Sequence, residues 1–152
     1  MLNALLISAG IEFYAFLIQF VLFILQVISL WSLFKKANVA GWKSIIPIYS
    51  DYKMFDIVWE TKYFWMNIGL SVVYGVLMYL VQNVITAGVF FIVLTIFRLI
   101  VLFFSCMIEY FFCRHIAFSY GKGTGFAFGL FFLYPIFILI LGLGSSRFVG
   151  KR

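Results

Sequence analysis

The fold of this chain is decided by the stretch KKANVAGWKSIIPIYSDYKMFDIVWETK, residues 35–62. It is the only long polar stretch in a sequence that is otherwise strongly apolar. Because apolar runs precede and follow it, this stretch determines which side of a bilayer each run faces and how often the chain crosses.

The composition excludes a soluble globular protein. Of the 152 residues, 66% are hydrophobic and 11% are charged, whereas soluble domains carry about 25% charged residues. This composition predicts an all-α integral membrane protein that forms a single domain over residues 1–152. The net charge of +6 does not indicate nucleic acid, because the basic residues lie beside apolar spans rather than along a basic stripe.

Four apolar segments are long enough to be transmembrane helices, and they cover residues 11–34, 63–81, 85–112 and 126–143. Lys35 and Lys36 follow the first of them, and no Lys or Arg precedes it. The positive-inside rule then predicts an outer N-terminus and a cytoplasmic stretch 35–62.

The fourth segment contains Tyr134-Pro135, which predicts a kink. A complete fourth crossing places the tail outside, although the tail carries Arg147, Lys151 and Arg152. A segment that only dips into the membrane is the alternative.

Apolar residues recur at helical spacing after Pro47, within the polar stretch. They predict a short amphipathic helix on the cytoplasmic membrane surface, and a surface that docks a partner protein is the alternative. The predicted interfacial residues are Trp42, Tyr52, Phe55 and Trp59, with Ile48 on the same face.

Polar residues also form stripes inside the apolar segments. Glu12, Gln19 and Gln26 recur every seven residues and share one helix face, and the second span carries a similar stripe with Asn67 and Ser71. We expect the stripes to hydrogen-bond neighbouring helices; a path lined with water is the alternative.

The third span holds Arg98, Ser105 and Glu109. Arg98 and Gln19 lie equally far from the basic residues at the cytoplasmic ends of their spans. We therefore expect the first and third spans to pack together, with Arg98 bound to Gln19 or Glu12; the alternative is an Arg98 that reaches outer phosphates alone.

Gly121, Gly125 and Gly129 repeat every four residues, a spacing that favours close helix packing. Anion binding by Lys122 at a helix N-terminus is the alternative interpretation. No Ser–Lys pair, metal-binding motif or paired intramembrane Asp is present. We therefore expect no enzyme, no cofactor and no metal site.

Two blocks of the chain carry specific motifs: LWSLFKKANVAGWKSIIPIYSDYKMFDI (residues 30–57) and HIAFSYGKGTGFAFGLFFLYPIFILILGLGSSRFVG (residues 115–150). Their Gly-Trp, Ile-Pro-Ile-Tyr and Gly-Lys-Gly-Thr-Gly-Phe motifs resemble a domain-of-unknown-function family of small bacterial multi-pass membrane proteins. The resemblance implies a bacterial cell membrane and no established activity, and some members carry a signal-peptidase label.

These observations favour a non-catalytic polytopic membrane protein that serves as an accessory or assembly subunit of a membrane complex. Its expected partners are the lipid bilayer and other membrane proteins, or further copies of itself, and not nucleic acid. The alternative is a small transporter or channel that acts as an oligomer, because four short helices leave little room for a pore in one copy.

Overall fold

The computed structural model describes residues 2–83 and 88–151, with side chains from residue 11 onward. This part of the chain is helical and contains no strand. Its elements are α1 (Leu2–Lys36), the 3-10 helix η1 (Gly41–Ser44), α2 (Pro47–Val58), α3 (Thr61–Asn83), α4 (Val89–Ser119), α5 (Thr124–Phe132) and α6 (Tyr134–Leu143).

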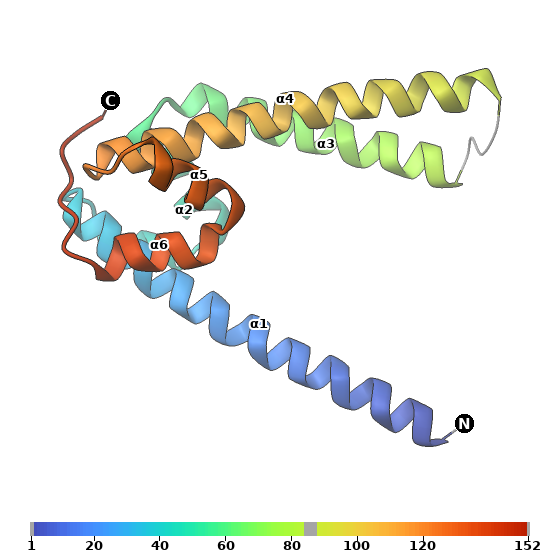
Figure 1. The fold of residues 1–152 in the computed structure, drawn as a ribbon, viewed down its shortest axis with the longest axis horizontal. Helices are drawn as coiled ribbons and strands as arrows, with labels where there is room; N and C mark the ends of the chain where they lie inside the picture. The colour runs from blue at the N-terminus through green and yellow to red at the C-terminus, as the bar shows by residue number, and fades with distance from the viewer. Residues whose placement is uncertain (1, 84–87, 152) are drawn as a thin grey trace.

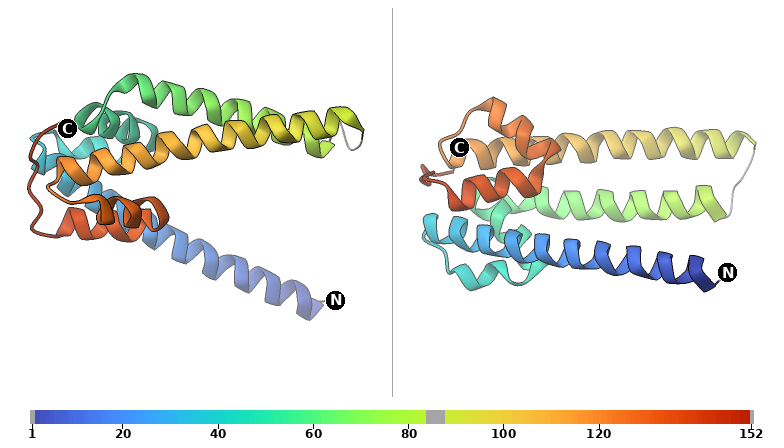
Figure 2. Two further views of the ribbon diagram at one scale, coloured as in Figure 1. Left: turned by 45° about the horizontal axis from the view of Figure 1, so that its top comes forward. Right: turned by 60° about the horizontal axis from the view of Figure 1, so that its bottom comes forward.

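The long helices diverge from one end of the molecule. Helices α3 and α4 pack side by side as an antiparallel pair, whereas α1 leaves them at an angle (Figures 1 and 2). The short helices gather where α1 ends and α4 ends. We call this end, residues 29–60 and 112–151, the head.

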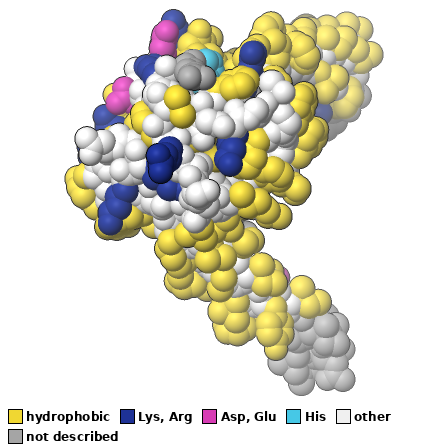
Figure 3. Space-filling model, turned by 60° about the vertical axis from the view of Figure 1, so that its left-hand side comes forward, with side chains coloured by type: hydrophobic (Ala, Val, Ile, Leu, Met, Phe, Trp, Pro, Cys, Tyr) yellow, Lys and Arg dark blue, Asp and Glu magenta, His cyan; other side chains and the backbone are white. Residues whose placement is uncertain are grey.

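Buried apolar side chains concentrate in the head, whereas every side chain from Ile11 to Ile24 is exposed. Figure 3 shows the matching surface, with charged side chains gathered on the head and hydrophobic ones along the projecting helix. The head therefore has its own core, while the long helices need an apolar solvent around them. The core includes Leu33, Phe34, Met54, Phe55, Val58, Ile116, Ala127, Leu130, Ile138 and Leu141.

Three helices are long and apolar enough to cross a membrane: Ile11–Lys36, Thr61–Asn83 and Val89–Ser119, with mean hydropathies of 2.3, 1.7 and 2.7. They agree with the first three predicted spans. Helix α4 continues to Ser119, beyond the predicted end at 112, and the predicted start at 85 lies outside the described residues.

The predicted fourth span is not confirmed, because the segment is broken into two short helices. Helices α5 and α6 contain 9 and 10 residues, about 14 and 15 Å, or roughly half of a 30 Å bilayer core. The break falls at Leu133 (φ −129°, ψ 49°), just before Tyr134-Pro135. Both outer ends of this helical pair lie in the head (Figure 1), as in the dipping alternative.

Helix α6 is held against the end of α1 by a close crossing. A Cβ atom at Gly142 would lie 2.7 Å from the backbone oxygen of Ser29, so only glycine allows this approach. Ser32 Oγ donates to Gly142 O at 2.7 Å. The tail then passes the C-terminal end of α4, where Val149 N donates to Ser119 O at 2.7 Å.

Helix α2 begins at Pro47, as predicted, because proline suits the first turn of a helix. Its Phe55 is a core residue, 3% exposed, and stacks on Phe112 with ring centroids 3.8 Å apart. The interfacial role predicted for Phe55 is therefore wrong, because α2 packs on α3 and α4. Trp42 is exposed, while Tyr52 and Trp59 are half-buried.

The three repeating glycines have different surroundings. A Cβ at Gly129 would overlap the Phe137 ring, so α5 and α6 lie close together there. Gly125 has nothing within 4 Å of its Cβ position, so the prediction of close packing there is wrong. Gly121 has φ +72° and forms the turn after α4, a conformation that favours glycine.

Candidate functional site

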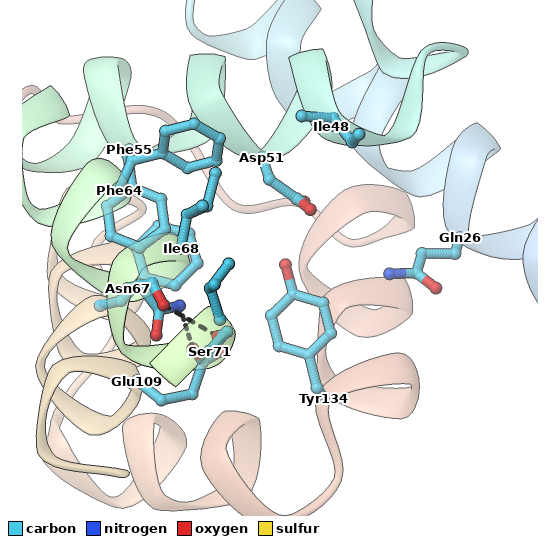
Figure 4. Close-up of a pocket in the computed structure, with 12 residues that line it drawn as sticks. Gln26, Ile48, Asp51, Phe55, Phe64, Asn67, Ile68, Ser71, Glu109 and Tyr134 are labelled. Atoms are coloured by element: carbon cyan, nitrogen blue, oxygen red, sulfur yellow. Dashed lines mark hydrogen bonds between the residues drawn. The ribbon is translucent and has the colours of Figure 1, made fainter. Parts of the chain in front are cut away.

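A cavity of about 540 Å³ lies where α1 leaves the head. This volume is within the usual range for a ligand-binding pocket. Helices α1, α2, α3, α4 and α6 contribute to its walls (Figure 4). The lining residues are Gln26, Ile48, Asp51, Phe55, Phe64, Asn67, Ile68, Ser71, Val72, Glu109, Phe112 and Tyr134.

Polar side chains from all five helices converge on this cavity. In Figure 4 the carboxylate of Asp51 and the hydroxyl of Tyr134 point toward one another, and the amide of Gln26 points toward Tyr134. On the opposite wall Asn67 Nδ2 donates to Glu109 Oε2 over a long 3.4 Å. Such convergence of a few polar groups on an otherwise apolar pocket is typical of a binding site.

The two carboxyl groups of the cavity have no basic partner among the described residues. The ion pairs found there join Lys53 to Asp56 and Lys62 to Glu60, both away from the cavity. A carboxylate in apolar surroundings is costly without a paired cation. The cavity therefore carries an uncompensated negative charge whenever these groups are ionised.

Removal from water raises the pKa of Asp51 from 3.8 to about 6. The side chain is exposed to the open cavity, yet protein surrounds it on most sides. Desolvation disfavours the charged form of a carboxyl group, which explains the direction of the shift. Asp51 thus changes charge close to neutral pH.

Asp51→Asn is expected to stabilise the protein at pH 7.5 and to leave it unchanged at pH 4. The folded pKa lies above the unfolded one, so stability contributed by this group falls between pH 4 and 6 as the proton is lost. Solvent in the cavity screens the charge, which limits the gain to about 1 kcal/mol. Thermal unfolding in detergent at both pH values measures it.

Asp56→Asn is the matched control for that experiment, since Asp56 is an exposed acid on the same helix and pairs with Lys53 at 2.9 Å. It should gain no stability at pH 7.5. An equal gain in both variants would show that the effect arises from net charge rather than from the cavity.

Local structure explains how Asp51 and Tyr134 reach the cavity. Pro47 starts α2 one turn before Asp51, and the stacking of Phe55 on Phe112 holds that helix over the cavity. The helix break at Leu133 makes Tyr134 the first residue of α6, and the Tyr134 ring points its hydroxyl toward Asp51 (Figure 4).

The structure brings together only some of the predicted polar residues. Gln26 and Glu109 line the cavity, so polar groups of the first and third spans do meet there. Glu12 and Gln19 are exposed on the projecting part of α1, and half-buried Ser105 is not among the cavity residues.

The predicted bond from Arg98 to Gln19 or Glu12 is wrong. Arg98 Nη1 instead lies 3.2 Å from the Met78 sulfur on α3. The physical reason is that α1 packs against α6 and η1, not along α4. The depth comparison that favoured this pairing assumed a parallel bundle, whereas α1 diverges.

Asp51 and Tyr134 were missed as site residues by sequence reasoning. Asp51 is one of several charges on a short amphipathic helix, and Tyr134 stood out only for the proline that follows it. The sequence signal that points to this cavity is the polar stripe with Asn67 and Ser71 on the second predicted span, because both residues line the α3 wall of the cavity.

Among the described side chains, no group of three His, Cys, Asp or Glu residues is arranged to hold a metal ion. No protein-family model, curated protein or solved structure matches this chain. The fold and the cavity define a helical protein with three apolar helices of membrane-spanning length. The family resemblance noted from the sequence stays a prediction.

Proposed function

We propose that this protein is a non-catalytic subunit of a membrane complex and that its cavity receives part of a partner membrane protein. The observation that carries the proposal is the convergence of Gln26, Asp51, Asn67, Glu109 and Tyr134 at the point where α1 diverges from α3. Three of these residues, Gln26, Asn67 and Glu109, belong to helices of membrane-spanning length.

The apolar solvent around those helices supports the proposal. Lipid tails neither donate nor accept hydrogen bonds, so polar groups between apolar helices need water or another protein. A partner helix that replaces lipid beside α1 and α3 loses no apolar contact and gains polar ones. An accessory subunit with an open, polar docking position has this form.

We also propose an orientation in a bacterial cell membrane. The N-terminus is outside, residues 35–62 are cytoplasmic, and α5 and α6 enter the cytoplasmic leaflet and return. The bonds from Lys36 to the end of α6 support a shared side for the tail and the polar stretch. Arg147 and Lys151 then add to the positive charge inside.

Cysteine labelling in intact cells tests this orientation. With Cys106 and Cys113 replaced by Ala, single cysteines are placed at the exposed positions Asn38, Asn83 and Ser145. An impermeant maleimide should label Asn83→Cys only, because the other two positions face the cytoplasm. Labelling of Ser145→Cys together with Asn83→Cys would contradict the returning helical pair.

Photocrosslinking tests the proposed docking position. Benzoylphenylalanine at Val72, which lines the cavity and is 61% exposed, should capture a discrete membrane protein through one of its transmembrane segments. The control position Val93 is 54% exposed on α4, away from the cavity, and should capture lipid. Equal capture at both positions would remove the support for a docking cavity.

A small transporter built as an oligomer is the second candidate function. Glu109 favours it, because this acid lines the cavity from a helix of membrane-spanning length and intramembrane acids line cation and proton paths. In one copy α1 diverges from α4 (Figure 1), so further copies would have to complete a path between these helices. Cation flux into liposomes that is lost in Glu109→Gln would favour this candidate.

A further inference from the structure

We infer that the cavity binds a basic side chain, Lys or Arg, carried by a transmembrane helix of the partner. This inference deepens the proposed function and rests on it. It starts from charge complementarity: Asp51 and Glu109 face the cavity, and no Lys or Arg is among its lining residues.

The hydrogen bonds made inside the protein do not compensate these two acids. Glu109 accepts a single long bond from Asn67 at 3.4 Å, and the carboxylate of Asp51 points into the cavity toward the Tyr134 hydroxyl (Figure 4). A cation inside the cavity would offset the negative charge of these acids, and the Gln26 carbonyl and the Tyr134 oxygen offer it further acceptors. An ammonium or guanidinium group offers the donors that these acceptors lack.

The size of the cavity favours a long side chain over a bare ion. A volume of about 540 Å³ holds more than ten waters at about 30 Å³ each. The wall also includes apolar residues such as Ile48, Phe64 and Ile68. Lys and Arg combine an apolar stem with a charged end, so such a wall suits both parts of the side chain.

The route into the cavity favours a membrane-embedded carrier of the charge. Ser71 and Val72 of the α3 wall are exposed, and α1 diverges from α3 and α4 toward its N-terminus (Figures 1 and 2). The cavity is therefore reached from the side where the two apolar helices leave the head. A basic residue within a transmembrane helix is costly in lipid and requires an acidic partner of this kind.

A designed peptide tests the inference without knowledge of the natural partner. The full chain is reconstituted in phosphatidylcholine liposomes with a fluorophore at Asn38→Cys, after Cys106 and Cys113 are replaced by Ala. A labelled Leu/Ala helix of about 20 residues carries one Lys in the half that borders the head, and a matched peptide carries Gln. Energy transfer should report about tenfold tighter binding of the Lys peptide.

The double variant Asp51→Asn, Glu109→Gln should bind both peptides equally, whereas Asp56→Asn should keep the full preference for Lys. Because the double change removes uncompensated charges, the variant is expected to fold. Equal binding of both peptides by the unmodified protein would overturn the inference. So would a Lys preference that survives the double change, or displacement of the Lys peptide by equimolar dodecylamine, which would indicate a cationic lipid.

Different results would contradict the docking function and the recognition of a basic side chain. A partner crosslinked at Val72 whose captured segment lacks Lys and Arg leaves the docking function standing and overturns the basic side chain. Preferential binding of the Lys peptide, with no protein captured at Val72 in cells, supports the charge recognition and overturns the subunit role.

Discussion

Gly142→Ala is expected to destabilise the protein by about 2–3 kcal/mol, the upper part of the range for overpacking a tight contact. The added methyl would lie 2.7–2.9 Å from the Ser29 backbone and Cβ atoms, which belong to α1 and cannot rotate away. Helix α6 would have to move off α1, and the bond from Ser32 to Gly142 O would lengthen with it. Thermal unfolding in detergent, read by tryptophan fluorescence, measures the loss.

Gly75→Ala is the matched control. Gly75 is an exposed glycine within α3, and nothing lies within 4 Å of its Cβ position. Alanine there should be neutral or slightly stabilising, because glycine is a poorer helix former. If both alanine variants unfold at the same temperature as the unmodified protein, α6 does not approach α1 as closely as the structure indicates.

Local signals in the sequence predicted the elements that need no tertiary information. Apolar runs of sufficient length define α1, α3 and α4, and Pro47 with a helical apolar repeat defines α2. Charge around Lys35 and Lys36 indicated the boundary of the first span. Each of these features depends on residues within one element.

The return of α6 could not be read from sequence, because it depends on contacts between elements distant in the chain. Tyr134-Pro135 predicts a kink whether the chain continues or turns back. What turns it back is the crossing of Gly142 on Ser29 and the bonds from Lys36. A glycine and a lysine that lie 106 residues apart show no pattern in a single sequence.

Only part of the cavity could be predicted from the sequence, because one of its acids is identified only by contacts between elements. Gln26 and Glu109 were noticed because polar groups are rare in apolar runs. Asp51 lies on a helix with other charges, where an acid that faces a cavity has the same local pattern as one that faces water. Only the packing of α2 over α3 and α4 separates Asp51 from Asp56.

Lys36→Met is the second change with a large expected effect. Lys36 Nζ donates to the carbonyls of Leu141 and Gly142 at 2.8 Å and of Gly144 at 2.7 Å, and it also lies 3.2 Å from Ser146 Oγ. These carbonyls end α6 and lack partners within the helix, where a positive charge is also favourable.

Methionine keeps the apolar stem of Lys36 but removes its charged donor. The carbonyls of Gly142 and Leu141 then keep only the hydroxyls of Ser32 and Ser146. Water can replace the donor at Gly144, where the bond is exposed, so we expect a loss of about 2 kcal/mol. The control Lys35→Met removes an exposed charge whose contact is with the Trp31 ring at 5.7 Å and should cost less than 0.5 kcal/mol, about the limit for a surface change. Thermal unfolding compares the two variants, and limited proteolysis at the tail reports whether α6 has left α1. Equal, small losses in both, with an equally protected tail, would mean that the close crossing at Gly142 holds α6 without Lys36.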